Sequence, residues 1–555
     1  MITGFDWVLN RQELLEWTHQ DHVQILWVYG QPGCGKSFLY YKVLEYVEDN
    51  TAKPTVYFLF CEADRERSTA SSLLRSWTFQ LLALLWTFNR GSETLQRIKR
   101  QLACRTTLEA TAGEVSRLLL SLLNAEDMPT CFLAVDALDE CSDIQVLFYL
   151  LPKIPKRFKI FATSRELPDT PAFNQIERPE ENIRTLEITP DLTQEDVDRY
   201  LHKAVNTLRT IDGKPLPDGL REMIIKRLSD SKGMFLYIRV MIEYIHTQTT
   251  IDDIKKCLYD LPPTLTQRYR RIVDEISLQE VPHRLLAHKT IFWALTADRP
   301  LAARELCAAL AVRPAAIDDS LVYSDNRRQL GDDPKMLIYR VCGTLIRPRR
   351  DVGMVYPFHA TVTQYLKVWA EGIGLVREVA GFYQLPPDLN SEGIAAAVCM
   401  RYLSSSVVTS LRDRALGDAE SVNRILVSGV KELDFLRYAV TQWFVHARFI
   451  QEGDEFLLGI AERLLHERSP TREIIWRMYW FSELERSETA EGCPTEFSGL
   501  HMAAYFGLVQ VVKRLLRNTR HYVRDGQGRT PLWRAAEKGY EQVVRVLRDA
   551  GAAMC

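Results

Sequence analysis

One short motif, the glycine-rich segment GQPGCGKS at residues 30–37, constrains the fold of this 555-residue chain more than any other feature. It follows an apolar run at 25–29, of the kind that is buried on both faces of a parallel sheet. It precedes residues 38–47, whose apolar positions recur at helical spacing. Strand, glycine-rich loop and helix in this order predict a phosphate-binding loop rather than an ordinary glycine turn.

The spacing G-x-x-x-x-G-K-S lets consecutive backbone N–H groups turn inward around phosphates, at the positive end of the following helix. The lysine would reach the β and γ phosphates, and the serine hydroxyl would be a ligand of Mg²⁺. We therefore expect the whole motif to bind a nucleotide through Gly30, Gln31, Pro32, Gly33, Cys34, Gly35, Lys36 and Ser37.

A second buried run, at 131–135, ends in a group of carboxylates. A carboxylate at the end of a neighbouring strand can hold hydrated Mg²⁺, and another a few residues on can orient the attacking water. We assign Asp136 to the metal and Glu140, with Asp139 beside it, to the water. The alternative is a strand that ends in a solvated acidic turn, and the phosphate loop upstream favours the catalytic interpretation.

A further run, at 159–163, closes with Ser164 and Arg165. In an α/β domain with its motifs in this sequence order, the carboxyl end of that strand is expected beside the phosphate loop, where Arg165 could sense the γ-phosphate. A salt-bridged surface arginine is the alternative.

Strand-like runs alternate with helical patterns up to about residue 190, and this alternation predicts a parallel α/β sheet. Beyond it the strand signal fades, and Thr193 with Asp196 forms a capping-box-like pair that opens a series of amphipathic helices. Helix-like stretches after 282 are followed by β-like runs at 336–346 and 352–358, a pattern typical of a winged helix.

The last part of the chain repeats itself with a period of 32 residues. Small and apolar residues keep their register in the two copies, a pattern that resembles ankyrin repeats. The repeated positions are Leu500, Ala503, Ala504, Gly507, Val511, Val512, Leu515 and Leu516, which recur as Leu532, Ala535, Ala536, Gly539, Val543, Val544, Leu547 and Arg548.

The predicted fold class is thus an α/β P-loop NTPase followed by α-helical and winged-helix domains and a C-terminal ankyrin segment. The expected boundaries are 1–190 for the NTPase domain, 191–281 for the helical domain, 282–372 for the winged helix, 373–490 for a helical connector and 491–555 for two visible ankyrin repeats.

Composition restricts the partners and the compartment. Lys+Arg 70 against Asp+Glu 72 gives a net charge of -2, so we expect no nucleic-acid binding. The apolar stretch at 77–88 is interrupted by Gln80 and is shorter than a bilayer span, and the N-terminus has no signal-peptide pattern. The 11 cysteines contain no C-x-x-C pair, which favours reduced thiols and a cytoplasmic location.

At this point the chain resembles a known family, the NACHT domains of fungal NOD-like receptors, which are the nephrocystin-like branch of the STAND NTPases. The resemblance rests on residues 30–37, 136–140 and 163–165, on the opening TGFDWVL at 3–9, and on weaker motifs: DLPPTL at 260–265 with Tyr269, RPL at 299–301, Glu305-Leu306, and Phe358-His359 with Tyr365-Leu366. Thr361 replaces the serine that is usual in the last of these motifs.

The resemblance implies an ATP/ADP-gated signalling switch that senses a protein partner through its ankyrin repeats, self-associates in the ATP state and hydrolyses ATP slowly as a reset. It also implies that His359 contacts the β-phosphate in the closed state, although a histidine satisfied within the winged helix is the alternative. An effector domain usually precedes the NACHT domain, whereas only 29 residues precede Gly30 here. An effector on another chain, a truncated gene model and a regulator without its own output all remain open.

Two rival functions come from other classes. The first is an ankyrin scaffold whose nucleotide is structural and is not turned over. The second is a P-loop phosphotransferase, which would need an acceptor pocket that no motif indicates.

Overall fold

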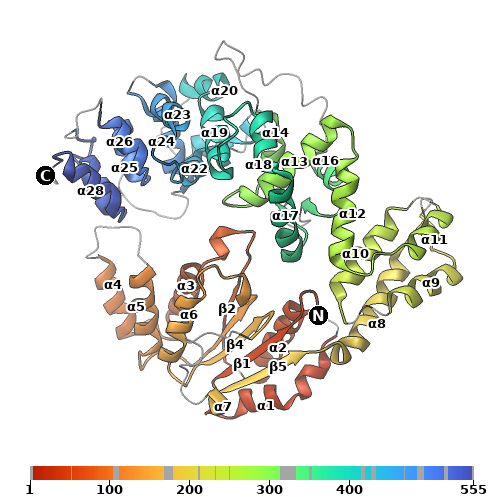
Figure 1. Cartoon of the computed structure of the whole chain (residues 1–555). Coiled ribbons are helices and arrows are strands. Elements are labelled where there is room, and N and C mark those ends of the chain that lie inside the picture. Colours follow the sequence, from red (N-terminus) through yellow and green to blue (C-terminus); the bar gives the residue numbers. More distant parts are fainter. Residues whose placement is uncertain are drawn as a thin grey trace. The chain divides into compact units, whose positions relative to one another are not determined.

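The computed structural model describes residues 4–51, 53–103, 112–167, 179–210, 213–229, 231, 233–248, 250–312, 333–348, 353–413, 419–426, 433–467, 469–483, 493–517 and 523–552. The chain divides into two compact units, with the change between Arg271 and Ile272, and each unit is described by itself (Figure 1).

A five-stranded sheet organises the first unit, in the order β2-β3-β4-β1-β5 (Figure 1). All neighbouring strands pair in parallel, as the sequence predicts. The strands are β1 (Ile25–Gly30), β2 (Thr55–Leu59), β3 (Phe132–Asp136), β4 (Lys159–Ser164) and β5 (Ile183–Ile188). The edge strand β5 is an addition to the prediction, because its alternation of buried and exposed residues lacks the continuous apolar run of a central strand.

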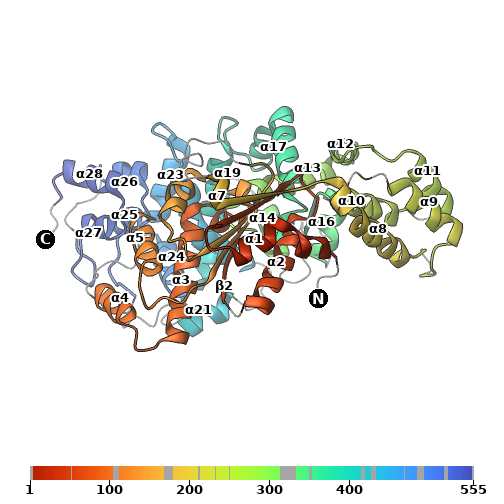
Figure 2. The ribbon, with the colours of Figure 1, turned by 90° about the horizontal axis from the view of Figure 1, so that it is seen from below.

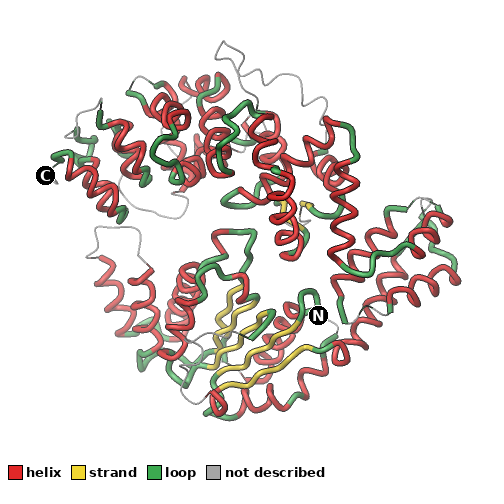
Figure 3. Tube along the Cα trace, viewed as in Figure 1, coloured by secondary structure: helices red, strands yellow, loops and turns green. Residues whose placement is uncertain are grey.

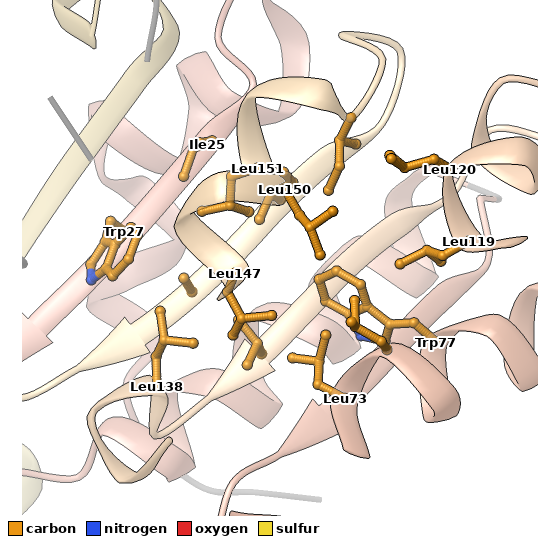
Figure 4. A pocket seen from close by; sticks show the side chains of 15 residues that line it. Ile25, Trp27, Leu73, Trp77, Leu119, Leu120, Leu138, Leu147, Leu150 and Leu151 are labelled. Atoms are coloured by element: carbon orange, nitrogen blue, oxygen red, sulfur yellow. The ribbon is translucent and has the colours of Figure 1, made fainter. Parts of the chain in front are cut away.

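Both faces of this sheet are covered by helices. On one face, α3 (Ala70–Phe88), α5 (Ala112–Leu123) and α6 (Gln145–Leu150) pack on apolar strand residues such as Trp27. Figure 4 shows this core around Trp27, Trp77 and Leu147, where a cavity of about 20 Å³ remains. On the other face lie η1 (Asp6–Asn10), α1 (Gln12–His19) and α2 (Lys36–Thr51). The shorter or more peripheral elements are η2 (Arg65–Arg67), α4 (Glu93–Ala103), η3 (Leu138–Glu140), η4 (Leu151–Lys153) and α7 (Pro179–Asn182).

Helices follow the sheet, as predicted, but the first begins earlier than expected. It starts at Pro190 with Thr189 at its N-cap position, because proline is favoured in the first turn of a helix. Thr193 therefore lies inside the helix, where its hydroxyl donates to the carbonyl oxygens of Thr189 and Pro190. The helices are α8 (Pro190–Thr207), α9 (Asp218–Leu228), α10 (Phe235–His246), α11 (Ile251–Tyr259) and α12 (Leu265–Ser277).

In the second unit, the predicted β-run at 336–346 is wrong over most of its length. The segment Pro334–Cys342 is a helix, α16, since Asp333 caps it by accepting from the N–H groups of Lys335 and Met336. Only β6 (Ile346–Pro348) and β7 (Val355–Pro357) form an antiparallel pair. This pair is preceded by α13 (Val281–Thr296), α14 (Ala303–Ala311) and α16, and followed by α17 (Ala360–Ile373) and α18 (Leu375–Phe382).

The rest of the described chain is helical (Figure 3). The helix α19 (Ser391–Leu403) is buried along almost its whole length and packs against α22 (Leu436–Ala447) and α23 (Glu455–Leu465). The neighbouring elements are α20 (Ser406–Thr409), η6 (Ser410–Asp413), α21 (Ala419–Leu426) and α24 (Pro470–Glu483). Within the described ranges, no helix is long and apolar enough to cross a membrane.

Two helix pairs close the chain at the predicted repeat positions: α25 (Gly499–Tyr505) with α26 (Val509–Leu515), and α27 (Pro531–Glu537) with α28 (Glu541–Asp549). The pairs stack on each other (Figure 2). Arg534 is buried in the second pair, where it donates to Asp525 at 2.6 Å and to Glu537 at 3.1 Å.

Because removal of Arg534 leaves the buried Asp525 carboxylate without its cation, Arg534→Met should destabilise the second pair by about 3–5 kcal/mol. Hydrogen exchange should then show loss of amide protection in α27 and α28. Arg545→Met, at an exposed position of α28, is the matched control and should change little. Equal protection in the two variants would contradict the structural role of the buried pair.

Candidate functional site

The phosphate-loop motif connects β1 to α2, as predicted. Two of its positions need glycine, because of their backbone conformation and because other residues pack directly against them. Gly33 and Gly35 have φ of 81° and 97°, a region that favours glycine. A Cβ atom on Gly33 would lie 2.4 Å from Cβ of Leu236, and one on Gly35 would lie 2.3 Å from Cζ of Phe5. Other residue types would therefore displace both neighbours and strain the loop.

Two segments that are distant in sequence, the start of α10 and the N-terminal segment around Phe5, pack against this loop. The N–H of Leu236, in the first turn of α10, donates to the Gly33 carbonyl oxygen at 3.2 Å. Phe5 lies 5.5 Å from Phe235, ring centre to ring centre, and its backbone N–H donates to the Asp196 carboxylate at 3.0 Å. The loop is thus fixed to both the N-terminal segment and α10.

Lys36 bends back over the loop. Its ammonium group donates to the carbonyl oxygens of Gly30 at 2.5 Å and Gln31 at 3.0 Å. Burial lowers its pKa from the usual value, because the charged form loses hydration. Phosphate oxygens placed against the loop would offer this cation stronger, charge-assisted partners than the two carbonyl groups.

Ser37 and Asp136, the two residues assigned to Mg²⁺, lie side by side. The Ser37 hydroxyl donates to the Asp136 carboxylate at 2.6 Å, and the Thr163 hydroxyl donates to its other oxygen. Asp136 is only 3% exposed. Burial raises its pKa, and the two hydroxyl hydrogen bonds oppose the rise. A hydroxyl and a carboxylate are hard oxygen donors, which fit Mg²⁺ when water and phosphate complete its shell.

Asp139 and Glu140, which the sequence analysis placed together at the water, have different environments. Asp139 accepts from Arg165, from its Nε at 2.8 Å and from its backbone N–H at 3.0 Å. Arg165 is thus close to this acidic turn and is held by an ion pair.

Glu140 instead lies in a less hydrated position, where it accepts from the backbone N–H of Glu62 at 2.9 Å. Burial raises its pKa to about 7, and the negative charges of Asp139 and Glu62 add to the rise. A carboxyl group that is half ionised near neutral pH can serve as a general base. The turn that presents it starts at Ala137, whose φ of 56° reverses the chain directly after β3.

Thr163, Phe5, Leu236 and the N–H of Glu62 were not among the predicted site residues. Thr163 could have been found, because its strand-end motif was recognised and a hydroxyl there can reach the neighbouring strand. Phe5 belongs to the segment TGFDWVL at 3–9, which carries part of the family resemblance, but its place beside the loop was not predicted. The contacts of Leu236 and of the Glu62 N–H depend on tertiary packing that no local pattern encodes.

His359 lies in the second unit, at the N-cap position of α17. Its Nδ1 accepts from the backbone N–H of Thr361 at 3.2 Å. The histidine therefore has a capping role within its own unit, and its expected contact with a β-phosphate stays a prediction.

Comparisons with known proteins agree with the resemblance expected from the sequence. Residues 4–165 match the family described as "Nephrocystin 3, N-terminal", and residues 473–555 match "Ankyrin repeats (3 copies)". The ankyrin match thus begins ahead of the boundary expected at 491. The vegetative incompatibility protein HET-E-1 of Podospora anserina is 22% identical over 463 residues. The alignment covers 80% of this chain but only 32% of that protein.

Solved structures give weaker likenesses. The Orc1 protein of Aeropyrum pernix in complex with DNA has a TM-score of 0.30 at 12% identity, covering 65% of this chain and 91% of that one. Cdc6p of Pyrobaculum aerophilum has a TM-score of 0.27 at 14% identity, covering 64% and 92%. Scores this low carry no inference about the site. The matches confirm the predicted resemblance: similarity to the nephrocystin 3 N-terminal family, similarity to a fungal incompatibility protein, and ankyrin repeats at the C-terminus.

The environment of Glu140 generates a prediction for nucleotide hydrolysis. Since the base acts in its ionised form, the hydrolysis rate should rise with pH through about 7 and then level off. Glu140→Gln should lose about 100-fold or more in rate and retain nucleotide binding, because a positioned base contributes about that much. Rates measured across this pH range test both statements.

Asp139→Asn is the matched control, since it removes a neighbouring carboxylate that is paired with Arg165. Its profile should keep a rising limb near neutral pH. A flat profile in the unmodified protein, or full activity of Glu140→Gln, would remove Glu140 from the base role.

Proposed function

We propose that this protein is a nucleotide-gated (ATP/ADP) switch of the NOD-like receptor type, which senses a protein partner through its ankyrin repeats. The hydrogen bond between Ser37 and Asp136 is the observation that carries the proposal, since it joins the phosphate loop to the carboxylate at the end of β3. The family matches support the same class of NTPase.

In the proposed binding step, the backbone N–H groups of residues 30–37 and the first turn of α2 hold the phosphates. Lys36 exchanges its two carbonyl partners for phosphate oxygens. Ser37 and Asp136 would hold Mg²⁺, which would neutralise phosphate charge when bound.

In the proposed hydrolysis step, Glu140 orients a water and accepts its proton. Arg165 is the positioned cation beside it, and Asp139 orients that cation through the ion pair. A phosphotransferase would need an acceptor pocket, and no sequence motif indicates one, so the proposal takes water as the acceptor. Slow turnover would suit a switch, because the bound nucleotide is itself the signal.

In the proposed gating step, the loop transmits its state to α10, because the Leu236 N–H is bonded to the Gly33 carbonyl oxygen. Partner binding to the repeats would favour an open form with a different affinity for ATP. The proposal also includes self-association in the ATP form and a cytoplasmic location. It further assigns a winged-helix domain around β6 and β7 and keeps the division into five domains.

The proposed binding step is tested by removing the lysine charge. Lys36→Ala should raise the dissociation constant for ATP by about 100-fold, since charge-assisted hydrogen bonds contribute about 1.5–3 kcal/mol each. Titration calorimetry on the full chain measures this change. Lys42→Ala, in the same helix but paired with Asp6, is the matched control and should bind normally. Normal ATP affinity of Lys36→Ala would refute the nucleotide site.

The proposed closed state is tested at His359. If its imidazole contacts a β-phosphate, His359→Ala should shift the ratio of ADP to ATP affinity by about tenfold. His359→Asn preserves a cap acceptor for α17 but has a shorter reach, so it should shift the ratio equally. An unchanged ratio in both variants, with lower thermal stability in His359→Ala alone, would leave the histidine a purely structural cap.

A further inference from the structure

The hydroxyl of Thr163, near the carboxyl end of β4, bonds to two groups of the neighbouring chain segment. It donates to the Asp136 carboxylate, and it accepts from the backbone N–H of Ala137 at 3.0 Å. Thr163 is fully buried, so solvent does not compete for either partner. A hydroxyl has one proton and two lone pairs, and this one can serve both groups at once. A single side chain therefore connects the carboxylate with the backbone of the residue that follows it.

These bonds lie just beyond the paired part of the two strands. The register between β3 and β4 ends at Val135 and Ala162. Directly after β3 the chain reverses at Ala137, whose φ of 56° is uncommon for a residue other than glycine. Because the N–H at this reversal has no carbonyl partner in the strand pairing, it needs another acceptor. The Thr163 side chain supplies that acceptor.

The turn that begins at Ala137 presents the two acidic residues of the site. The backbone N–H of Glu140 donates to the Ala137 carbonyl oxygen at 2.9 Å, within the short helix η3. The turn is joined to the end of β4 a second time, because the backbone N–H of Arg165 donates to the Asp139 carboxylate at 3.0 Å. Loss of the Thr163 hydroxyl would therefore loosen the start of the turn without releasing it from β4.

At the carboxylate of Asp136, Thr163 and Ser37 bond to different oxygens. Thr163 donates to Oδ1, and Ser37 donates to Oδ2 at 2.6 Å. In the proposed function Ser37 and Asp136 hold Mg²⁺, so a bound cation competes with the Ser37 bond and leaves the Thr163 bond in place. Groups that orient a metal ligand in this way affect metal affinity by about 10- to 100-fold.

We propose that Thr163 is a positioning residue that couples the metal-binding carboxylate to the base. Its hydroxyl orients Asp136 toward the phosphate loop and, through the Ala137 N–H, fixes the turn that carries Glu140. The inference rests on the proposed function, because it assigns a role within the same nucleotide site. A hydroxyl that only fills the core would change stability, but it would change neither metal affinity nor the order of the turn.

The metal half of the coupling is tested with Thr163→Val, which removes the hydroxyl and keeps the shape of the side chain. The probe is Mn²⁺, which takes the same oxygen ligands as Mg²⁺ and is detected by electron paramagnetic resonance. For the full chain saturated with ADP, the dissociation constant of Mn²⁺ should rise at least about tenfold. ADP affinity in EDTA should stay unchanged, because the loop backbone and Lys36 still hold the phosphates. Thr163→Ser keeps the hydroxyl and should restore metal affinity.

The turn is tested without nucleotide, by hydrogen exchange of residues 137–140 in the full chain. Exchange should be at least about tenfold faster in Thr163→Val, since the first N–H of the turn loses its acceptor, and it should be normal in Thr163→Ser. Thr78→Val is the matched control: it removes another buried threonine hydroxyl, which donates within α3 to the Leu74 carbonyl oxygen. It should change neither Mn²⁺ affinity nor exchange in the turn.

Unchanged Mn²⁺ affinity in Thr163→Val, or a loss that Thr163→Ser does not restore, would overturn the coupling. So would unchanged exchange at residues 137–140, or equal effects in Thr78→Val. If the unmodified chain binds no ADP, the proposed function and the metal half of the inference both fail, and exchange at 137–140 still decides whether Thr163 anchors the turn. If Thr163→Val does not fold, Thr163→Cys takes its place with the same outcomes deciding, because a thiol is only a weak donor.

Discussion

The buried carboxylate of Asp136 is the point on which the functional geometry of the first unit depends. It receives hydroxyl hydrogen bonds from Ser37 and Thr163, and so it connects the phosphate loop after β1 with the ends of β3 and β4. A buried carboxylate without such donors would be costly, and its neighbours therefore cannot change freely. The parallel sheet makes this meeting possible because the carboxyl ends of its strands share one edge.

The phosphate loop is in turn connected to neighbouring segments by close backbone and ring contacts. Gly33 and Gly35 let Leu236 and Phe5 approach the loop to distances that a Cβ atom would forbid. An otherwise unpaired N–H in the first turn of α10 uses a loop carbonyl as its acceptor. In the proposed function, a change in loop conformation on phosphate binding would therefore be passed to the start of α10 through this hydrogen bond.

The sequence predicted the strands around the site and the repeat positions because each carries a local pattern: a continuous apolar run, a phosphate-loop spacing or a 32-residue period. It did not predict β5, an edge strand that mixes buried apolar with exposed polar residues. It also did not predict α16, whose apolar residues were interpreted as a strand although Asp333 and Pro334 ahead of them start a helix. The sequence also did not predict that Asp139 and Glu140 have different environments. Only packing decides which carboxylate forms the ion pair with Arg165 and which is half-buried, accepting from the Glu62 N–H.

The central claim, that nucleotide bound at the phosphate loop acts on α10, can be measured directly by hydrogen exchange of the full chain. With Mg²⁺ and a non-hydrolysable ATP analogue, we expect slower amide exchange both in residues 30–37 and at the start of α10, around Leu236. The same addition to Lys36→Ala should leave both segments unchanged. Protection of the loop without any change at Leu236 would contradict the coupling, and no protection at either segment would contradict the nucleotide site itself.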